Sequence, residues 1–149
     1  MNKDALIVAV SDFHSGSNWA LFLDHEWHGN KTSHIPRSQQ MEIRGQFEKY
    51  AEAVRQKRQG KNVILVHNGD AIDGDHHHSS DVCSVDNLEQ ADVHIELMIE
   101  LQKRIDWQAG DKLYYTMGTQ THVNEREHYI VKELGAVESP TGGAWNELH

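Results

Sequence analysis

The chain has 149 residues and a mass of 17.0 kDa, which suits one domain with a buried core but is short for two. Hydrophobic residues make up 38%, which is low for a globular chain but does not indicate disorder, and the formal net charge is −9 at pH 7. This charge argues against a strong nucleic-acid-binding patch, because phosphate contacts need clustered Lys and Arg. It leaves open an acidic, phosphate-bearing substrate, because a bound divalent cation can reverse the local field.

Nothing in the sequence indicates a membrane or an oxidising compartment. No apolar stretch approaches the length of a membrane span. The single cysteine, Cys83, cannot form an intramolecular disulfide. We therefore expect a soluble, cytoplasmic protein that does not contact a membrane.

The first half of the chain predicts a strand, a loop and a helix. Residues 5–10 are continuously apolar and rich in β-branched side chains, a pattern typical of a strand covered on both faces. A polar loop rich in Trp and His follows, to about residue 37. Ser38 can then cap a helix that Gly60 ends. One face of this helix carries Met41, Phe47, Ala51 and Val54.

The second half continues the alternation. Residues 63–66 predict a second buried strand and residues 113–117 a third. Between them lies a long amphipathic helix. Its apolar residues and closing glycine are Leu88, Ala91, Ile95, Met98, Leu101, Ile105 and Gly110. Asn124 and Glu127 resemble a capping box that opens a last helix, which stops at Gly135.

The order β-α-β-α-β-α predicts the fold class. Such alternation calls for an α/β fold, with a sheet layered with helices. No internal repeat or low-complexity linker divides the chain. We therefore expect one domain over residues 1–149.

Residues that can carry chemistry follow each predicted strand. The first strand is followed by Asp12 and His14, the second by Asp70 and Asp73, and the third by "GTQTH", which ends at His122. In open α/β sheets the loops at the carboxyl ends of the strands converge on the ligand site. We therefore expect these side chains to surround one pocket.

The residue types in this pocket favour a metal site. Carboxylate and imidazole together suit divalent ions such as Mn, Fe, Zn or Ni. Gly69, directly before Asp70, permits a sharp turn and the close approach that a carboxylate bridging two ions would need. Two ions about 3.5–4 Å apart can activate a water and clamp the oxygens of a phosphoryl group. The native ion is left open.

Three blocks, "DFH", "GDAIDG" and "GTQTH", resemble those of the calcineurin-like metallophosphoesterases, which read Asp-x-His, Gly-Asp-x-x-Asp-(x)-Gly and Gly-Asn-His-Asp/Glu. The resemblance covers roughly residues 5–135, and the third block is similar to that of phage-encoded members. It implies a metallophosphoesterase-like fold and the hydrolysis of phosphomonoesters or phosphodiesters, nucleotides included. It also implies two divalent metal ions that activate the attacking water.

The resemblance assigns roles residue by residue. Asp12 and His14 would bind one ion, and Asp70 would bridge both ions. His122 matches the family histidine that sits over the substrate phosphate and acts as general acid or stabilises the transition state. Asp73 is the second carboxylate of its block and would fix the loop and the neighbouring histidine rather than bind metal.

The chain departs from the family in two places. Thr121 stands where the family has a metal-binding Asn, and which of Thr119, Gln120 and Thr121 replaces that Asn is left open. The later Gly-His-x-His block of the family is not in the sequence, so we expect the C-terminal part of the fold to be missing. The alternative function is therefore a truncated or degenerate phosphoesterase domain without catalysis, with a structural or binding role.

Other histidines and tryptophans allow two readings each. A solvated loop is favoured for the run at residues 76–78, which could also contact a substrate phosphate. A surface position is favoured over lining of the cleft for His25, His28 and His34. Trp19 and Trp27 could stack on a base, but anchoring the long first loop to the core is the commoner use of such residues. The physiological substrate and the oligomeric state are left open.

Overall fold

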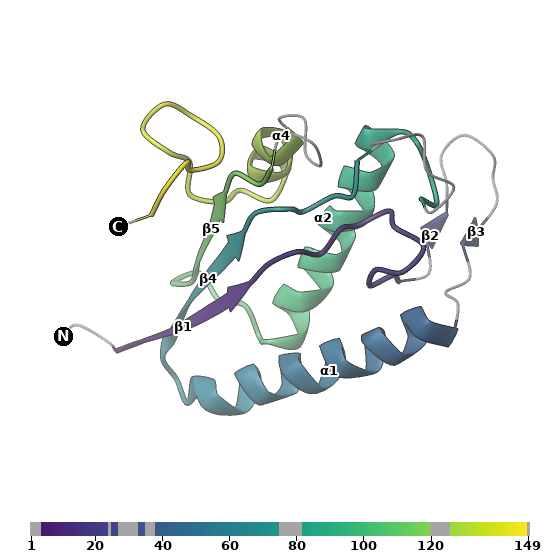
Figure 1. The fold of residues 1–149 in the computed structure, drawn as a ribbon. Coiled ribbons are helices and arrows are strands. Elements are labelled where there is room, and N and C mark those ends of the chain that lie inside the picture. The colour runs from purple at the N-terminus through teal and green to yellow at the C-terminus, as the bar shows by residue number, and fades with distance from the viewer. Residues whose placement is uncertain are drawn as a thin grey trace.

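The computed structural model describes residues 4–23, 25–26, 33–34, 38–74, 82–119 and 126–148. These residues form a small α/β domain with a three-stranded parallel sheet and three helices (Figure 1). In chain order the elements are β1 (Ala5–Val10), β2 (His25–Glu26), β3 (Ser33–His34), α1 (Ser38–Arg58), β4 (Asn62–Asn68), α2 (Asn87–Arg104), β5 (Lys112–Thr116) and α4 (Arg126–Glu133). The predicted α/β class and the predicted alternation of strands and helices are confirmed. Among the described helices, none combines the length and apolar composition that a membrane span requires.

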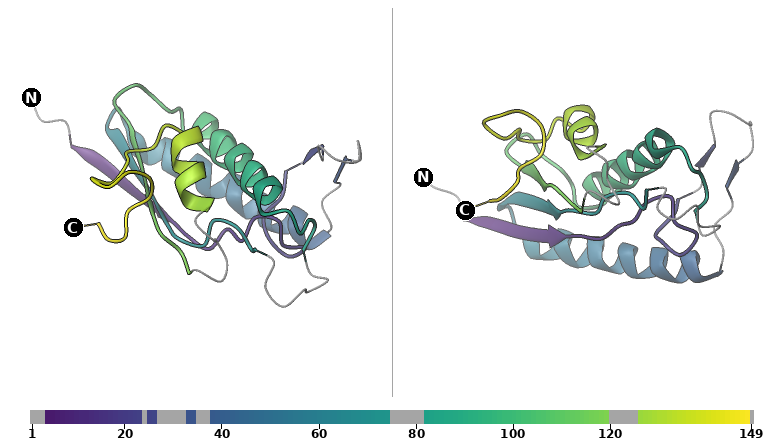
Figure 2. Two further views of the ribbon diagram at one scale, coloured as in Figure 1. Left: turned by 90° about the horizontal axis from the view of Figure 1, so that it is seen from above. Right: turned by 45° about the horizontal axis from the view of Figure 1, so that its top comes forward.

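The main sheet has the strand order β1-β4-β5, and both pairings are parallel. The three strands thus follow one another across the sheet in the order in which they occur in the chain. Because such crossovers are almost always right-handed, α1 and α2 are expected on the same face. The two helices contact each other, since the Arg104 guanidinium of α2 donates a hydrogen bond of 3.1 Å to Glu48 of α1. The packing of the helices against the sheet can be followed in Figure 2.

Strand β1 corrects one prediction, that it is covered on both faces. Its residues alternate, with Val8 only 4% exposed and Ile7 70% exposed. Strand β4 alternates in the same way, with Val63 and Leu65 fully buried and Ile64 between them half-buried. Helices that gather on one face leave the other face of the sheet uncovered, so a continuously apolar strand is here buried on one face only.

Helix α1 buries the predicted residues Phe47, Ala51 and Val54, but Met41 is 50% exposed. A helix turns by about 100° per residue, so Met41 lies about 120° around the axis from Phe47. The buried position at this end of α1 is Gln40, whose amide donates a hydrogen bond of 3.4 Å to the carbonyl of Ser17. Gln40 thereby ties α1 to the loop that follows β1.

Helix α2 provides the centre of the core. Its buried residues include Ala91, Leu97, Met98 and Leu101, while Leu88 at its start is 40% exposed. The Asp86 carboxylate caps the helix by accepting a hydrogen bond from the backbone N–H of Leu88. Helix α2 ends at Arg104 and therefore does not run to the predicted end at Gly110.

Candidate metal centre

The loops that follow β1 and β4 continue the parallel pairing of these strands beyond the strand ends. The backbone N–H of Asp12 donates to the carbonyl of Gly69 at 3.2 Å, and that of His14 donates to the carbonyl of Asp70 at 3.1 Å. These bonds fix the register of the two loops. The first two chemistry-bearing blocks of the sequence therefore lie side by side.

Asp12, His14 and Asp70 form a three-residue cluster at this edge of the sheet. One ligand atom from each, a carboxylate oxygen or an imidazole nitrogen, lies within 4.8 Å of the other two. The separation between Asp12 Oδ1 and His14 Nε2 is 4.0 Å. The structure thus brings together three of the five residues that the sequence placed around one pocket.

All three cluster residues have left-handed backbone conformations. The φ angles are 54° at Asp12, 44° at His14 and 53° at Asp70. Among the described residues, only two other non-glycine residues, Gln59 and Asp106, have positive φ. Such conformations cost about 1–3 kcal/mol each in the general case and gather at functional sites, where the surrounding structure enforces them. Backbone strain is therefore present at all three residues of the cluster.

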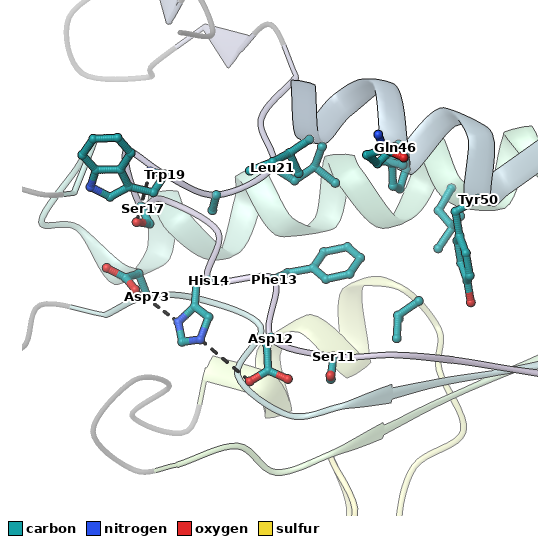
Figure 3. A pocket seen from close by; sticks show the side chains of 15 residues that line it. Ser11, Asp12, Phe13, His14, Ser17, Trp19, Leu21, Gln46, Tyr50 and Asp73 are labelled. Atoms are coloured by element: carbon teal, nitrogen blue, oxygen red, sulfur yellow. Dashed lines mark hydrogen bonds and ion pairs between the residues drawn. The ribbon is translucent and has the colours of Figure 1, made fainter. Parts of the chain in front are cut away.

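Asp73 lies on the opposite side of the His14 ring from Asp12 (Figure 3). Its Oδ1 is 3.2 Å from His14 Nδ1, while His14 Nε2 is on the side of Asp12. A carboxylate beside Nδ1 favours the tautomer that carries its proton on Nδ1, which leaves the lone pair of Nε2 directed at the cluster. His14 is thus in a suitable form to bind a cation.

The loop after β5 reaches the cluster through Thr119. Asp70 Oδ1 accepts two hydrogen bonds from this residue, at 2.7 Å from the backbone N–H and at 3.0 Å from the hydroxyl. The Thr119 hydroxyl is therefore a donor to a candidate ligand. Gln120 and Thr121, the other residues considered in place of the family Asn, lie outside the described residues.

Two glycines allow the loops after β4 and β5 to touch. Gly69 has a φ of 76°, and a Cβ on it would lie 2.9 Å from the Cα of Gly118. A Cβ on Gly118 would lie 2.3 Å from the backbone nitrogen of Asp70. The sharp turn and the close approach expected at Gly69 are both present.

Glu127 is a site residue that the sequence interpretation missed. Its carboxyl is fully buried, and its Oε1 accepts a hydrogen bond of 3.1 Å from the backbone N–H of Gly118. Burial raises the pKa of Glu127 to about 7, although the Gly118 N–H opposes this shift. The expected partner in a capping box, Asn124, lies outside the described residues. The signal that the sequence offered for this role of Glu127 was the position of an acidic residue just after the third block.

A buried layer of rings lies beneath the cluster. His94 contacts Ser15 Oγ through Nδ1 at 3.1 Å and Tyr115 Oη through Nε2 at 2.9 Å. The ring of His67 stacks on Tyr115 at a centroid distance of 4.7 Å and meets Phe13 edge-on. Burial lowers the pKa of His67 to about 3 and that of His94 well below its usual value, so both are neutral at pH 7. The layer supports the loop that carries Asp12 and His14.

Sequence reasoning also missed this layer. His67 occupies a position of β4 whose side chain points into the core, and His94 lies on the buried face of α2. The spacing of the apolar residues along β4 and α2 would have predicted that both histidine side chains are buried. Neither contributes to the three-residue cluster.

A cavity of about 650 Å³ adjoins the cluster, and Asp12, His14 and Asp73 are among its lining residues (Figure 3). Trp19 also lines it and is 56% exposed. The expectation that Trp19 anchors the first loop to the core is therefore wrong. Trp19 is instead a largely exposed residue at the wall of the cavity.

Several predicted residues lie outside the described part of the chain. His122, the expected general acid, is one of them. The others are Trp27, His28 and the histidine run at residues 76–78. His25 and His34 are paired in the short β2–β3 ladder.

No protein-family model matches the chain, and no curated protein and no solved structure shows a significant match to it. The resemblance to the calcineurin-like metallophosphoesterases thus stays a hypothesis drawn from three short blocks. The described residues themselves provide a candidate metal centre of two carboxylates and one imidazole.

Proposed function

We propose that the chain is a metal-dependent phosphoester hydrolase of the calcineurin-like type. The observation that carries this proposal is the convergence of Asp12, His14 and Asp70, whose ligand atoms lie within 4.8 Å of one another. Two carboxylates and one imidazole suit borderline divalent ions. Three protein ligands also leave coordination positions for water and substrate, which a catalytic centre requires and a purely structural one does not.

The cluster residues would hold one divalent cation, and Asp70 would share a second one, as the sequence blocks imply. Bound cations polarise a phosphoryl oxygen and lower the pKa of a bound water. Thr119 donates both its hydrogen bonds to Oδ1 of Asp70, which orients the carboxylate and keeps Oδ2 available. Asp73 holds His14 with Nε2 toward the cluster. Within the described part of the chain, the cluster consists of these three residues and offers no further ligand for a second ion.

His122 is the proposed general acid. In the hydrolysis, the attacking water loses a proton to solvent and forms a P–O bond, the bond from phosphorus to the alcohol oxygen breaks, and that oxygen takes a proton. His122 would supply the proton. Support comes from Thr119, which shares the third block with His122 and contacts Asp70 directly.

The proposed substrates are small phosphomonoesters or phosphodiesters, including nucleotides. A chain with a net charge of −9 has little to attract the backbone of a long nucleic acid. The candidate centre could still bind a single phosphoryl group, because a cation held by Asp12, His14 and Asp70 would offset their negative charge.

Hydrolysis of p-nitrophenyl phosphate and of its bis ester, with and without Mn²⁺, tests the proposal. We expect turnover that requires Mn²⁺ and falls to background in Asp70→Asn. Asp106→Asn is the matched control, because Asp106 also has a left-handed φ, of 59°, but lies outside the cluster. Mn²⁺ binding without turnover would favour the non-catalytic alternative. Turnover that survives in Asp70→Asn would contradict the proposed site.

A further inference from the structure

The cavity beside the candidate metal centre is large enough to hold more than a phosphoryl group. Its volume is about 650 Å³, and it runs between the loop after β1 and helix α1 (Figure 3). Asp12, His14 and Asp73 line the end nearest the cluster. Because Asp12 and His14 of the cluster line this cavity, the ester substituent of a phosphoryl group held at the cluster can extend into it.

Aromatic side chains form much of the cavity wall. They come from the loop after β1 and from α1, and they are Phe13, Trp19, Phe47 and Tyr50. Trp19 is 56% exposed and Tyr50 39% exposed, so both rings are partly open to solvent. The hydroxyl of Tyr50 donates a hydrogen bond of 3.1 Å to the carbonyl of Ala9, which fixes the ring in place. Large apolar groups left open around a cavity are a feature of binding sites.

A few polar groups lie among the apolar ones. Ser17, Ser11 and Gln46 line the cavity, and the Gln46 amide offers both a donor and an acceptor. The Oγ of Ser17 accepts a hydrogen bond of 3.3 Å from the backbone N–H of Trp19, which holds the loop beneath the exposed ring. Mostly apolar walls with few polar groups are typical of sites for small organic molecules.

We propose that this cavity binds the alcohol part of the substrate and selects phosphoesters whose alcohol carries an aromatic ring. The inference rests on the proposed function, since it assumes a phosphoryl group at Asp12, His14 and Asp70. Flat rings suit this wall better than flexible chains, because rings stack on aromatic side chains and Trp19, which lines the cavity, is 56% exposed. His14 and Trp19 line the same cavity, so a single ligand would present its phosphoryl group to the cluster and its ring to Trp19.

Binding of two phosphonates to the full chain with Mn²⁺ tests this inference. In benzylphosphonate a CH₂ group replaces the ester oxygen of phenyl phosphate, and methylphosphonate lacks the ring. Neither is hydrolysed, so leaving-group reactivity does not enter the comparison. By calorimetry we expect benzylphosphonate to bind on the order of tenfold more tightly, the usual effect of one ring stacked on an aromatic side chain.

Two variants remove parts of the wall. Trp19→Ala and Ile43→Ala are expected to bring the ratio of the two affinities toward one. Ile99→Ala is the matched control, because Ile99 is 39% exposed on α2 and Ile43 is 38% exposed on α1, but only Ile43 lines the cavity. The control should keep the wild-type ratio. Circular dichroism of each variant checks that the fold is retained.

The outcomes separate the inference from the proposed function. Equal affinity for the two phosphonates in the wild type, with Mn²⁺-dependent turnover of p-nitrophenyl phosphate intact, would overturn the aromatic preference alone. A wild-type preference that Trp19→Ala and Ile43→Ala leave unchanged would overturn the assignment to this cavity. Absence of both phosphonate binding and turnover in the presence of Mn²⁺ would overturn the proposed function and the inference together.

Discussion

Gly118 and Asp70 pass each other so closely that no side chain fits at residue 118. A Cβ there would lie 2.3 Å from the backbone nitrogen of Asp70, 2.5 Å from its Oδ1 and 2.8 Å from Oε1 of Glu127. The first of these neighbours is backbone and cannot simply rotate away. The contact joins the loops after β4 and β5, and the position of a candidate metal ligand depends on it.

Gly118→Ala is therefore expected to damage both stability and metal binding. Overpacking of this kind costs roughly 1–3 kcal/mol in the free energy of unfolding, which urea denaturation would measure. Calorimetry with Mn²⁺ should show weaker binding, because Asp70 has to shift. Gly45→Ala is the control, since a Cβ on Gly45, inside α1, meets nothing within 4 Å. That change should raise the stability by about 0.5–1 kcal/mol, and equal behaviour of the two variants would contradict the packing described here.

Asp73→Asn tests the proposed orienting role of Asp73. The variant keeps the size of the side chain but removes the charge beside Nδ1 of His14. We expect Mn²⁺ affinity to fall by about 10–100-fold, the usual effect of losing a carboxylate behind a ligating histidine. Asp92→Asn is the comparison, because Asp92 is also partly buried but accepts its hydrogen bond from Tyr129, away from the cluster. An unchanged affinity in Asp73→Asn would show that His14 does not depend on it.

Glu127→Gln is expected to change how stability depends on pH. The pKa of Glu127 is raised by burial from 4.5 to about 7 in the folded chain. Folding thus favours the protonated carboxyl, so this group destabilises the fold progressively as the pH rises from about 4.5 to about 7. The Gln side chain cannot ionise but can still accept the hydrogen bond from Gly118.

The variant should therefore gain stability relative to the wild type across this pH range. A difference on the order of 3 kcal/mol above pH 7 is the upper limit set by the size of the shift. Urea denaturation of both proteins at several pH values between 4 and 8 would measure it. A constant difference across the series would contradict the raised pKa.

Much of the fold could be predicted because it depends on local pattern. The apolar runs at residues 5–10 and 63–66 lie within β1 and β4, and helices follow both. The exposure of Ile7 could not be read from such a run. It depends on the direction in which strands are added and on the hand of the crossovers, which together place α1 and α2 on one face.

The candidate site also has a part that could be predicted from the sequence and a part that could not. Asp12, His14 and Asp70 were predictable because parallel strands bring their carboxyl ends to one edge of a sheet. Glu127 was not, since its burial against Gly118 arises from how α4 packs, far along the chain from Asp70. Trp19 was expected to anchor its loop to the core because that is the commoner use of Trp, whereas it is 56% exposed and lines the cavity.

The most direct test of the central claim is anomalous diffraction from crystals of the chain grown with Mn²⁺. We expect an anomalous peak about 2.0–2.6 Å from a carboxylate oxygen of Asp12, from Nε2 of His14 and from a carboxylate oxygen of Asp70. Asp70→Asn crystals grown in the same way should lose or weaken this peak. The absence of a peak at the cluster at saturating Mn²⁺, or peaks only elsewhere on the protein, would contradict the metal centre and the phosphoesterase proposed from it.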